Sequence, residues 1–160
     1  MASVVSLPEE FKIVDASAGP VTTNGGVTCD YISLANVHKV WVVASFTQAV
    51  GHATGIDPKR ATAVDGTGAA ALGTVVPIWA NEDTAASDTL VAQTAAVTYN
   101  VTNNIKKKQV IFEIDPATLG GSYDVLGCTV DDSSQATNFV SVLYVCQMRY
   151  KQATPPAVIS

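Results

Sequence analysis

Alternating apolar and polar positions recur along the chain, and the pattern is clearest between Asn138 and Tyr150. One set of alternate positions in this stretch is wholly apolar: Val140, Val142, Tyr144, Cys146, Met148 and Tyr150. The other set begins at Phe139 and turns polar towards Gln147 and Arg149. A period of two residues is typical of a β-strand. Such a strand needs neighbours at its hydrogen-bonding edges and a second layer over its apolar face.

Shorter stretches with the same period predict the neighbouring strands. They cover residues 11–16, 27–34, 37–47, 60–64, 74–80, 89–93, 96–101, 110–114 and 123–130. In 37–47 both sets of alternate positions are mostly apolar, which favours a place in the middle of a sheet or between layers. Pro77 interrupts 74–80 and favours a sheet edge or a bulge there, because proline cannot donate a hydrogen bond. For residues 84–93 a short helix capped by Thr84 is the alternative.

Turn signals separate these stretches at intervals of roughly 8–15 residues. Examples are a turn ending at Asp57-Pro58 and another at Asp65 to Gly68. Asp115-Pro116, followed by Gly120-Gly121, predicts a one-turn helix with Asp115 as N-cap. No helical period is sustained, so we expect an all-β fold: an antiparallel β-sandwich, jelly-roll-like, with extended terminal segments. The pattern leaves the strand order open.

The length of 160 residues predicts a single domain. We expect an N-terminal arm at residues 1–10, one β-sandwich domain at 11–151 and an extended C-terminal tail at 152–160. The tail contains Pro155-Pro156, which favours polyproline-like backbone. Both terminal segments are candidates for contacts with neighbouring subunits, although fraying of the arm is an equally good expectation.

The amino-acid composition indicates that the surface of such a sandwich is weakly charged. Charged residues are 14% of the chain, hydrophobic residues are 48%, and the net charge is −5. A weakly charged surface suits a subunit that neighbours cover, whereas the plainer alternative is an ordinary β-protein rich in Ala and Thr. The negative charge disfavours nucleic acid and anionic lipid as partners. The apolar runs are too short to cross a membrane and the N-terminus lacks signal-peptide form, so we expect synthesis in the cytoplasm.

Candidate chemistry is sparse, and we expect no catalytic, cofactor-binding or metal-binding residues and no enzyme activity. His38 and His52 lack the spacing of metal ligands. Gly66 to Ala71 fits a loose dinucleotide pattern, but no βαβ context surrounds it. No serine lies in a G-x-S-x-G elbow. The three cysteines, Cys29, Cys128 and Cys146, are expected to be buried thiols, with one disulfide left as the alternative.

Three further features each have a plain and a functional interpretation. Glu82-Asp83 and Asp131-Asp132 are expected to be solvated turns, with calcium binding as the alternative. Lys106 to Lys108 is expected to keep the adjoining strand soluble rather than to bind nucleic acid. Trp41 and Trp79 could stack on a sugar, but their apolar surroundings predict that both belong to the core.

Several stretches together resemble small virion proteins encoded among the head genes of tailed bacteriophages, the capsid decoration (cement) or minor capsid proteins. The stretches are His38–Val43, Ala63–Gly68 with Ala71-Leu72, Val76–Asp83, Val110–Pro116, and Met148–Tyr150 with Pro155–Ala157. They cover most of the chain from about residue 27 onward and are more specific for phage structural origin than for a place in the particle.

The resemblance implies a β-rich structural subunit that binds the outside of a phage capsid and cements it. It further implies the major capsid protein as partner, a homo-oligomer that is often a trimer, and a location in the virion. No catalytic residues come with it. The alternatives are a receptor- or glycan-binding sandwich of the tail or fibre, which predicts exposed aromatic residues in a groove, and a tail-tube or head-completion protein.

Overall fold

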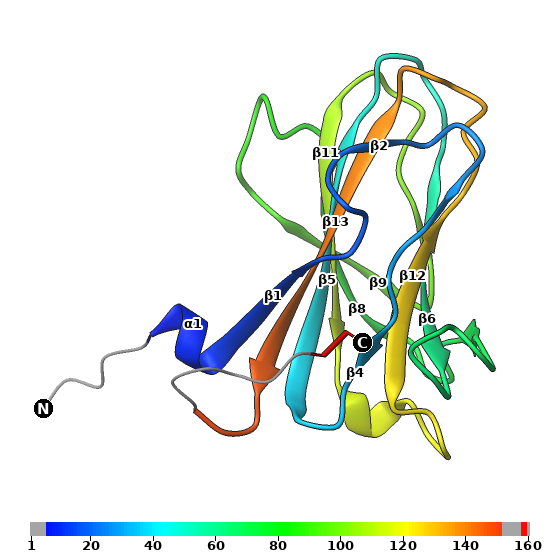
Figure 1. The fold of residues 1–160 in the computed structure, drawn as a ribbon. Coiled ribbons are helices and arrows are strands. Elements are labelled where there is room, and N and C mark those ends of the chain that lie inside the picture. The colour runs from blue at the N-terminus through cyan, green and yellow to red at the C-terminus, as the bar shows by residue number, and fades with distance from the viewer. Residues whose placement is uncertain (1–5, 152–157, 160) are drawn as a thin grey trace, which may run out of the picture.

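The computed structural model describes residues 6–151 and 158–159, whose strands form two facing antiparallel sheets (Figure 1). The large sheet contains β1 (Phe11–Asp15), β2 (Val21–Thr22), β5 (Val37–Thr47), β8 (Val76–Asn81), β9 (Val91–Ala96), β11 (Lys107–Ile114) and β13 (Phe139–Met148). The small sheet contains β3 (Val27–Thr28), β4 (Ile32–Ser33), β6 (Gly55–Ala61), β7 (Ala70–Ala71), β10 (Tyr99–Asn100) and β12 (Val125–Val130). The predicted all-β antiparallel sandwich is therefore confirmed.

The strand order is that of a jelly roll with an added hairpin. The large sheet has the order β1-β13-β5-β11-β8-β9, and the small sheet has the order β10-β6-β12-β3. Apart from the two-residue strands β2, β4 and β7 and the β8–β9 hairpin, the chain alternates between the two sheets except from β6 to β10, which are neighbours in the small sheet, as in a jelly roll. The β8–β9 hairpin widens the large sheet beyond β11.

The core lies between the two sheets and is built from one side of each long strand. On β13 the alternate residues predicted to be apolar are buried, with Val142, Tyr144 and Cys146 each 0% exposed. The Tyr144 hydroxyl donates to the backbone oxygen of Asp30 at 2.9 Å, so the phenol is buried without an unpaired polar atom. β5 lies between β13 and β11, and its residues Val40, Val42, Ala44 and Phe46 fill the same layer.

The structure corrects the prediction at Asp57-Pro58. A turn was expected there, yet β6 runs through both residues from Gly55 to Ala61. β12 pairs along one side of β6, whereas on the other side β10 pairs with Gly55 and Ile56, and β7 with Lys59 and Arg60. Pro58 falls in the gap between these two short strands, where no partner requires its missing N–H.

Several further predicted elements can be compared with the structure. The expected strand 27–34 is divided into β3 and β4, and no helix forms over 84–93. The expected strands 89–93 and 96–101 become β9 and β10, which lie in different sheets. Of the sheet edge or bulge expected at Pro77, the bulge is found: β8 lies inside the sheet, and its register with β9 shifts between Val76 and Ile78. The one-turn helix is confirmed as η1 (Pro116–Thr118), with the Asp115 side chain accepting from the Ala117 N–H.

The described parts of the terminal segments pack on their own subunit. In place of an extended arm, α1 (Leu7–Glu10) forms one helical turn, and Lys151 binds Glu9 at 3.1 Å and Glu10 at 3.6 Å. Val158 is 6% exposed, and its backbone oxygen accepts from the Ser33 N–H at 2.7 Å. Residues 1–5, 152–157 and 160 of the predicted arm and tail lie outside the described residues.

Candidate functional site

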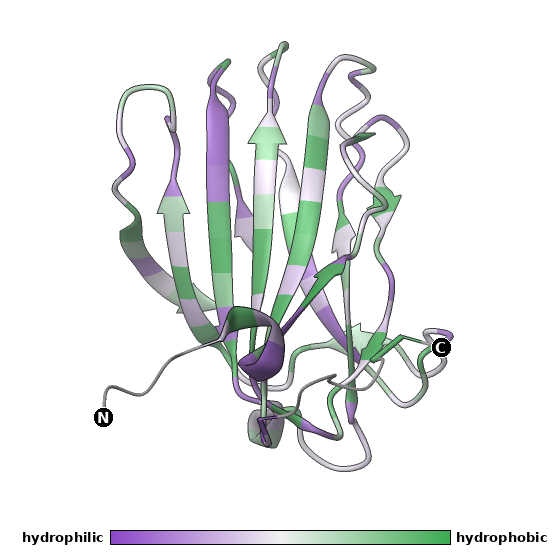
Figure 2. Cartoon of the chain, turned by 60° about the vertical axis from the view of Figure 1, so that its left-hand side comes forward, coloured by the Kyte–Doolittle hydropathy of each residue, from purple (hydrophilic) through white to green (hydrophobic). Residues whose placement is uncertain are grey.

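The outer face of the large sheet carries the candidate site. Because the inner positions of the long strands fill the core, the intervening residues point away from the small sheet. Figure 2 shows the long strands side by side, with α1 near one end of them. Several of the outward residues are large and apolar, and Ile13 is 52% exposed.

The strand register joins these outward residues into continuous rows. One row runs Leu143, Val43, Ile111, Trp79 and Ala92, with each residue paired to the next across β13, β5, β11, β8 and β9. The adjacent row runs Ile13, Val145 and Trp41 across β1, β13 and β5. We call these eight residues the outer apolar belt: Ile13, Trp41, Val43, Trp79, Ala92, Ile111, Leu143 and Val145. The belt crosses the sheet from β1 to β9.

Both tryptophans were predicted to be core residues, and the structure places both in the belt instead. On β5 the core positions are taken by Val40 and Val42, so Trp41 points outward; its ring centroid lies 6.3 Å from that of Phe11. Trp79 is 39% exposed on β8. One strand, β11, separates them, which puts their Cα atoms about 12 Å apart by strand spacing and rise. The apolar neighbours in sequence were misleading because they point to the opposite side of the sheet.

Charged side chains bound the belt at the α1 end. Lys39 and Glu113 form an ion pair of 2.5 Å on adjacent strands, with their side chains 33% and 32% exposed. The Lys39 Nζ also lies 6.0 Å from the Trp41 ring centroid. A pair exposed to this extent contributes little to stability, so it mainly limits how far the apolar surface extends.

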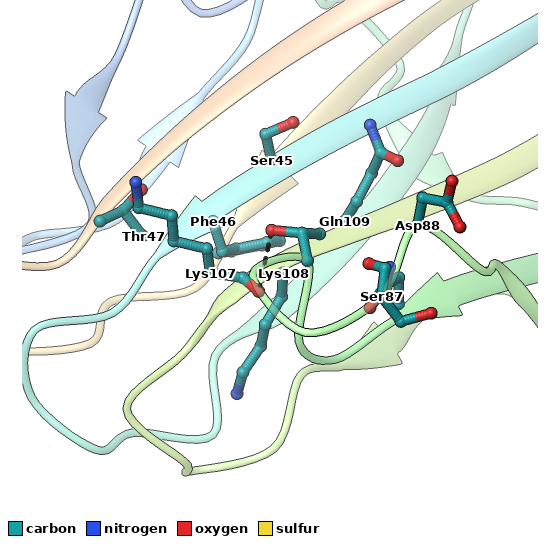
Figure 3. A pocket seen from close by; sticks show the side chains of 10 residues that line it. Ser45, Phe46, Thr47, Ser87, Asp88, Lys107, Lys108 and Gln109 are labelled. Atoms are coloured by element: carbon teal, nitrogen blue, oxygen red, sulfur yellow. Dashed lines mark hydrogen bonds between the residues drawn. The ribbon is translucent and has the colours of Figure 1, made fainter.

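A polar hollow of about 340 Å³ adjoins the belt at its other end (Figure 3). It is lined by Ser45, Phe46, Thr47, Asn81, Thr84, Ser87, Asp88, Lys107, Lys108 and Gln109. Trp79 lies two residues before Asn81 and on the same side of β8. Hydroxyl, amide, carboxylate and ammonium groups therefore gather next to an exposed indole, a set that can hydrogen-bond a polar ligand but includes no nucleophile paired with a base.

The loop at the rim of the hollow is fixed by hydrogen bonds. Asn81 donates from Nδ2 to the Ser87 oxygen at 2.7 Å, and its Oδ1 accepts from the Asp83 N–H at 2.9 Å. The Thr84 N–H donates to the Lys107 oxygen at 2.9 Å. Asp83 also pairs with Lys106 at 2.5 Å, and this hydrogen bond lowers the pKa of the Asp83 carboxyl. The loop is thus held against the start of β11.

Behind the hollow, Lys108 points in the opposite direction and is 1% exposed. Its Nζ lies 3.3 Å from Glu82 Oε2 and 2.9 Å from Thr102 Oγ1, and Tyr99 donates to Glu82 Oε1 at 2.8 Å. Burial lowers the pKa of Lys108, opposed by Glu82, whereas burial and Glu82 together raise the pKa of Tyr99. The alternation Lys108, Val110, Phe112 signalled this inward direction in the sequence.

The remaining predicted candidates have structural roles. Cys29, Cys128 and Cys146 are free and buried, and burial raises the pKa of Cys146 to about 12. Asp132 accepts from the N–H groups of Gly25 at 2.7 Å and Ser134 at 2.6 Å.

Neither the two histidines nor the glycine turn belongs to a group of metal ligands in the described part of the chain. His52 Nδ1 lies 3.2 Å from Thr54 Oγ1, and His38 is exposed at the start of β5. The Gly66–Gly68 segment forms a turn in which both glycines have positive φ. Across residues 6–151 and 158–159, no three His, Cys, Asp or Glu side chains gather to hold a metal ion. Within the same residues, no helix has the length and apolar character needed to span a membrane.

Comparison with known proteins does not assign the chain to a family. No protein-family model matches it, and no curated protein matches it. Among solved structures, a CBM4 structure shares 9% identity over 86% of this chain and 83% of that chain, at a TM-score of 0.31. A putative sugar-binding protein from Bacteroides thetaiotaomicron shares 9% identity over 76% and 67%, at a TM-score of 0.32. A T13 IBDV viral particle protein shares 12% identity over 97% and 46%, at 0.25. At such TM-scores these likenesses imply nothing about the ligand.

Proposed function

We propose that this protein is a non-enzymatic structural subunit of a virion, which binds the outside of a phage capsid and stabilises it as a decoration protein. The observation that carries the proposal is the outer apolar belt, two adjacent rows of apolar side chains that together cross the large sheet from β1 to β9 without a second layer from the small sheet. Exposed apolar surface of this kind is favourable to cover with another protein. The sequence resemblance to phage head proteins supports the choice of partner, the major capsid protein.

The belt is suited to a broad, flat contact rather than to a pocket. The backbone of its strands is fixed by pairing on both sides from β13 to β8, so little conformational entropy is lost when a partner binds. A standard interface covers about 800 Å² per partner, and apolar atoms at its centre supply most of the affinity. Repetition of the same contact over a shell multiplies a modest affinity for each copy.

Occupancy of capsids by belt variants tests this proposal. Ile111→Glu and Leu143→Glu each place a charge within the belt, whereas Val50→Glu places the same charge at a site that is 40% exposed and outside it. Each protein is mixed with undecorated capsids of its phage, and bound copies per particle are counted after sedimentation. We expect Val50→Glu to bind like wild type and the belt variants to bind at least about tenfold more weakly, which is about 1.4 kcal/mol. Equal occupancy for all four folded proteins would reject the belt as the capsid contact.

A second candidate function, glycan binding by a tail or fibre module, is favoured by one observation. Trp79 is exposed beside the polar hollow, and an indole face next to hydroxyl and amide groups is a suitable surface for a sugar ring. Titration of immobilised bacterial surface glycans with wild type and Trp79→Ala tests it. Saturable binding that Trp79→Ala abolishes, together with absence of capsid binding, would favour this function over decoration.

A further inference from the structure

Two of the three buried cysteines lie opposite each other on neighbouring segments of the small sheet. β3 pairs with β12 so that Thr28 faces Thr129. The register continues by one residue, because the Cys29 N–H donates to the Cys128 backbone oxygen at 2.9 Å. Opposite residues of an antiparallel pair have their side chains on the same side of the sheet. Here both side chains face the core, where Cys29 is 2% and Cys128 is 0% exposed.

The spacing of the two backbones suits a disulfide. Opposite residues that are joined by backbone hydrogen bonds have Cα atoms about 5.5 Å apart, and a disulfide requires roughly 4.4–6.8 Å. The two thiols also interact, because burial raises the pKa of the Cys128 thiol and a hydrogen bond with the Cys29 side chain raises it further. The strand pairing therefore brings the two sulfur atoms together without a change of register.

Cys146 lies in the other sheet. On β13 it is placed between Lys12 of β1 and Val40 of β5. Facing sheets pack about 10 Å apart, which exceeds the Cα separation that a disulfide can bridge. The pKa of the Cys146 thiol is raised by burial. Position and environment thus set Cys146 apart from the other two cysteines.

We propose that Cys29 and Cys128 form a disulfide by exchange with a disulfide oxidant, while Cys146 remains a thiol. The pair is then a modification site that ties β3 covalently to β12. A reducing cytoplasm keeps such thiols free, whereas oxidising surroundings allow the bond to form. The bond needs no capsid, so this inference does not rest on the proposed function.

Glutathione disulfide is a suitable oxidant for testing the reaction. One protein thiol loses its proton to solvent, and its thiolate attacks a sulfur of glutathione disulfide; the S–S bond of the reagent breaks, and a glutathione thiolate leaves. The thiolate of the second cysteine then attacks the protein sulfur of the mixed disulfide, and the second glutathione leaves. The two protein thiols are oxidised, and one glutathione disulfide is reduced to two glutathione molecules, which take up the two protons.

The reaction requires a local opening of the fold, because both thiols are buried and a raised pKa keeps the Cys128 thiol protonated. β3 is two residues long and ends the strand order of the small sheet, so the segment around Cys29 can separate from β12 without global unfolding. We expect oxidation to be slow in buffer and faster in urea at a concentration below the unfolding transition.

The disulfide would act where the chain joins the two sheets. The N–H of Asp30, which follows Cys29, donates to the Ala16 oxygen at 2.9 Å, and the Asp30 oxygen accepts from the Tyr144 hydroxyl at 2.9 Å. Tying Cys29 to Cys128 therefore also holds this connection between the sheets. Because the bond closes a loop of about 100 residues, we expect it to raise the melting temperature by roughly 5–15 °C.

Mass spectrometry tests the pairing directly in the wild-type protein. Reduced protein is incubated with glutathione disulfide in urea below the transition, the remaining thiols are alkylated, and the protein is digested without reduction. We expect the intact mass before alkylation to fall by that of two hydrogen atoms and alkylation to occur only at Cys146. The digest should contain two peptides joined through Cys29 and Cys128. A reductant should reverse both the bond and the gain in melting temperature.

Cys29→Ala and Cys146→Ala are matched variants, because each removes one buried thiol. We expect Cys146→Ala to oxidise and gain thermal stability as wild type does, and Cys29→Ala to form no internal disulfide and gain no stability. Wild type that keeps all three thiols, that retains a mixed disulfide with glutathione, or that forms a bond through Cys146 would each overturn the proposal. None of these measurements involves capsids, so they are independent of the test of the decoration function.

Discussion

The two faces of the large sheet are built from the same strands and differ in almost every other respect. Phe112 on β11 is 0% exposed in the core, whereas its neighbour Ile111 lies in the outer apolar belt. Inward positions are almost all apolar and closely surrounded, while outward positions mix the belt with an ion pair at one end and a polar hollow at the other. The difference teaches that apolar side chains have two roles here: inward ones hold the two sheets together, and outward ones are available to a partner.

Replacing adjacent residues on β11 should separate these roles most strongly. Phe112→Ala leaves a cavity between the sheets and is expected to lower the free energy of unfolding by about 3–5 kcal/mol. Ile111→Ala removes a side chain that solvent already reaches, so we expect a loss of less than about 1.5 kcal/mol. Urea denaturation followed by tryptophan fluorescence measures both.

The control for this pair is the slope of the unfolding transition. If both variants unfold with the wild-type slope, their midpoints report stability alone. Similar losses for Phe112→Ala and Ile111→Ala would mean that the outer face is covered in solution, for example by a second subunit, and would contradict the distinction between the faces.

Sequence pattern predicted the fold well where a strand has one clear apolar side. β5 was predicted with its observed bounds, and β11 and β13 were found in nearly the right places, because their inward residues alternate without interruption. The pattern failed at β6, where Pro58 suggested a turn. Local chemistry could not show that a gap between β10 and β7 would leave the proline unopposed, since that gap depends on strands distant in the sequence.

The candidate site was harder to predict than the fold. Trp41 and Trp79 were expected in the core because their sequence neighbours are apolar, but alternation alone cannot say which side of a two-sided apolar strand a second layer covers. The belt also depends on register: Val43, Ile111 and Trp79 are brought together by pairing between three strands. Single-strand periodicity contains no information on such rows.

The adjacent acidic residues Glu82 and Asp83 also differ in their partners: Glu82 faces the buried Lys108, whereas Asp83 pairs with the exposed Lys106. Replacing either is expected to lower stability less than Phe112→Ala does. Glu82→Gln removes the carboxylate that faces buried Lys108. We expect a loss of about 1.5–3 kcal/mol at neutral pH, because a charged donor loses its ionised acceptor in the interior. The measurement is urea denaturation at several pH values.

The pH dependence of the stability loss in Glu82→Gln tests whether Lys108 causes it. Burial lowers the pKa of Lys108 below its unfolded value of 10.5, and Glu82 opposes that shift. Without Glu82 the folded pKa falls further, so the unfolded state binds more protons than the folded state over a wider alkaline range, and stability rises with pH there. The deficit of Glu82→Gln should therefore shrink as pH increases from 7 towards the folded pKa of Lys108 in wild type. A deficit that stays constant or grows would exclude Lys108.

Asp83→Asn should have the smallest effect, because Asp83 meets Lys106 in solvent, where the Lys106 side chain is 48% exposed. The hydrogen bond from Lys106 lowers the pKa of Asp83 below its ordinary value of 3.8. A carboxyl with a lowered folded pKa contributes stability above pH 3.8 that is lost as pH falls through the folded value. Asp83→Asn should thus differ slightly from wild type at pH 6, less at pH 6 in high salt, and hardly at all near pH 2. A deficit as large as that of Glu82→Gln, or one insensitive to salt, would show that Asp83 is not the exposed, outward counterpart that the structure describes.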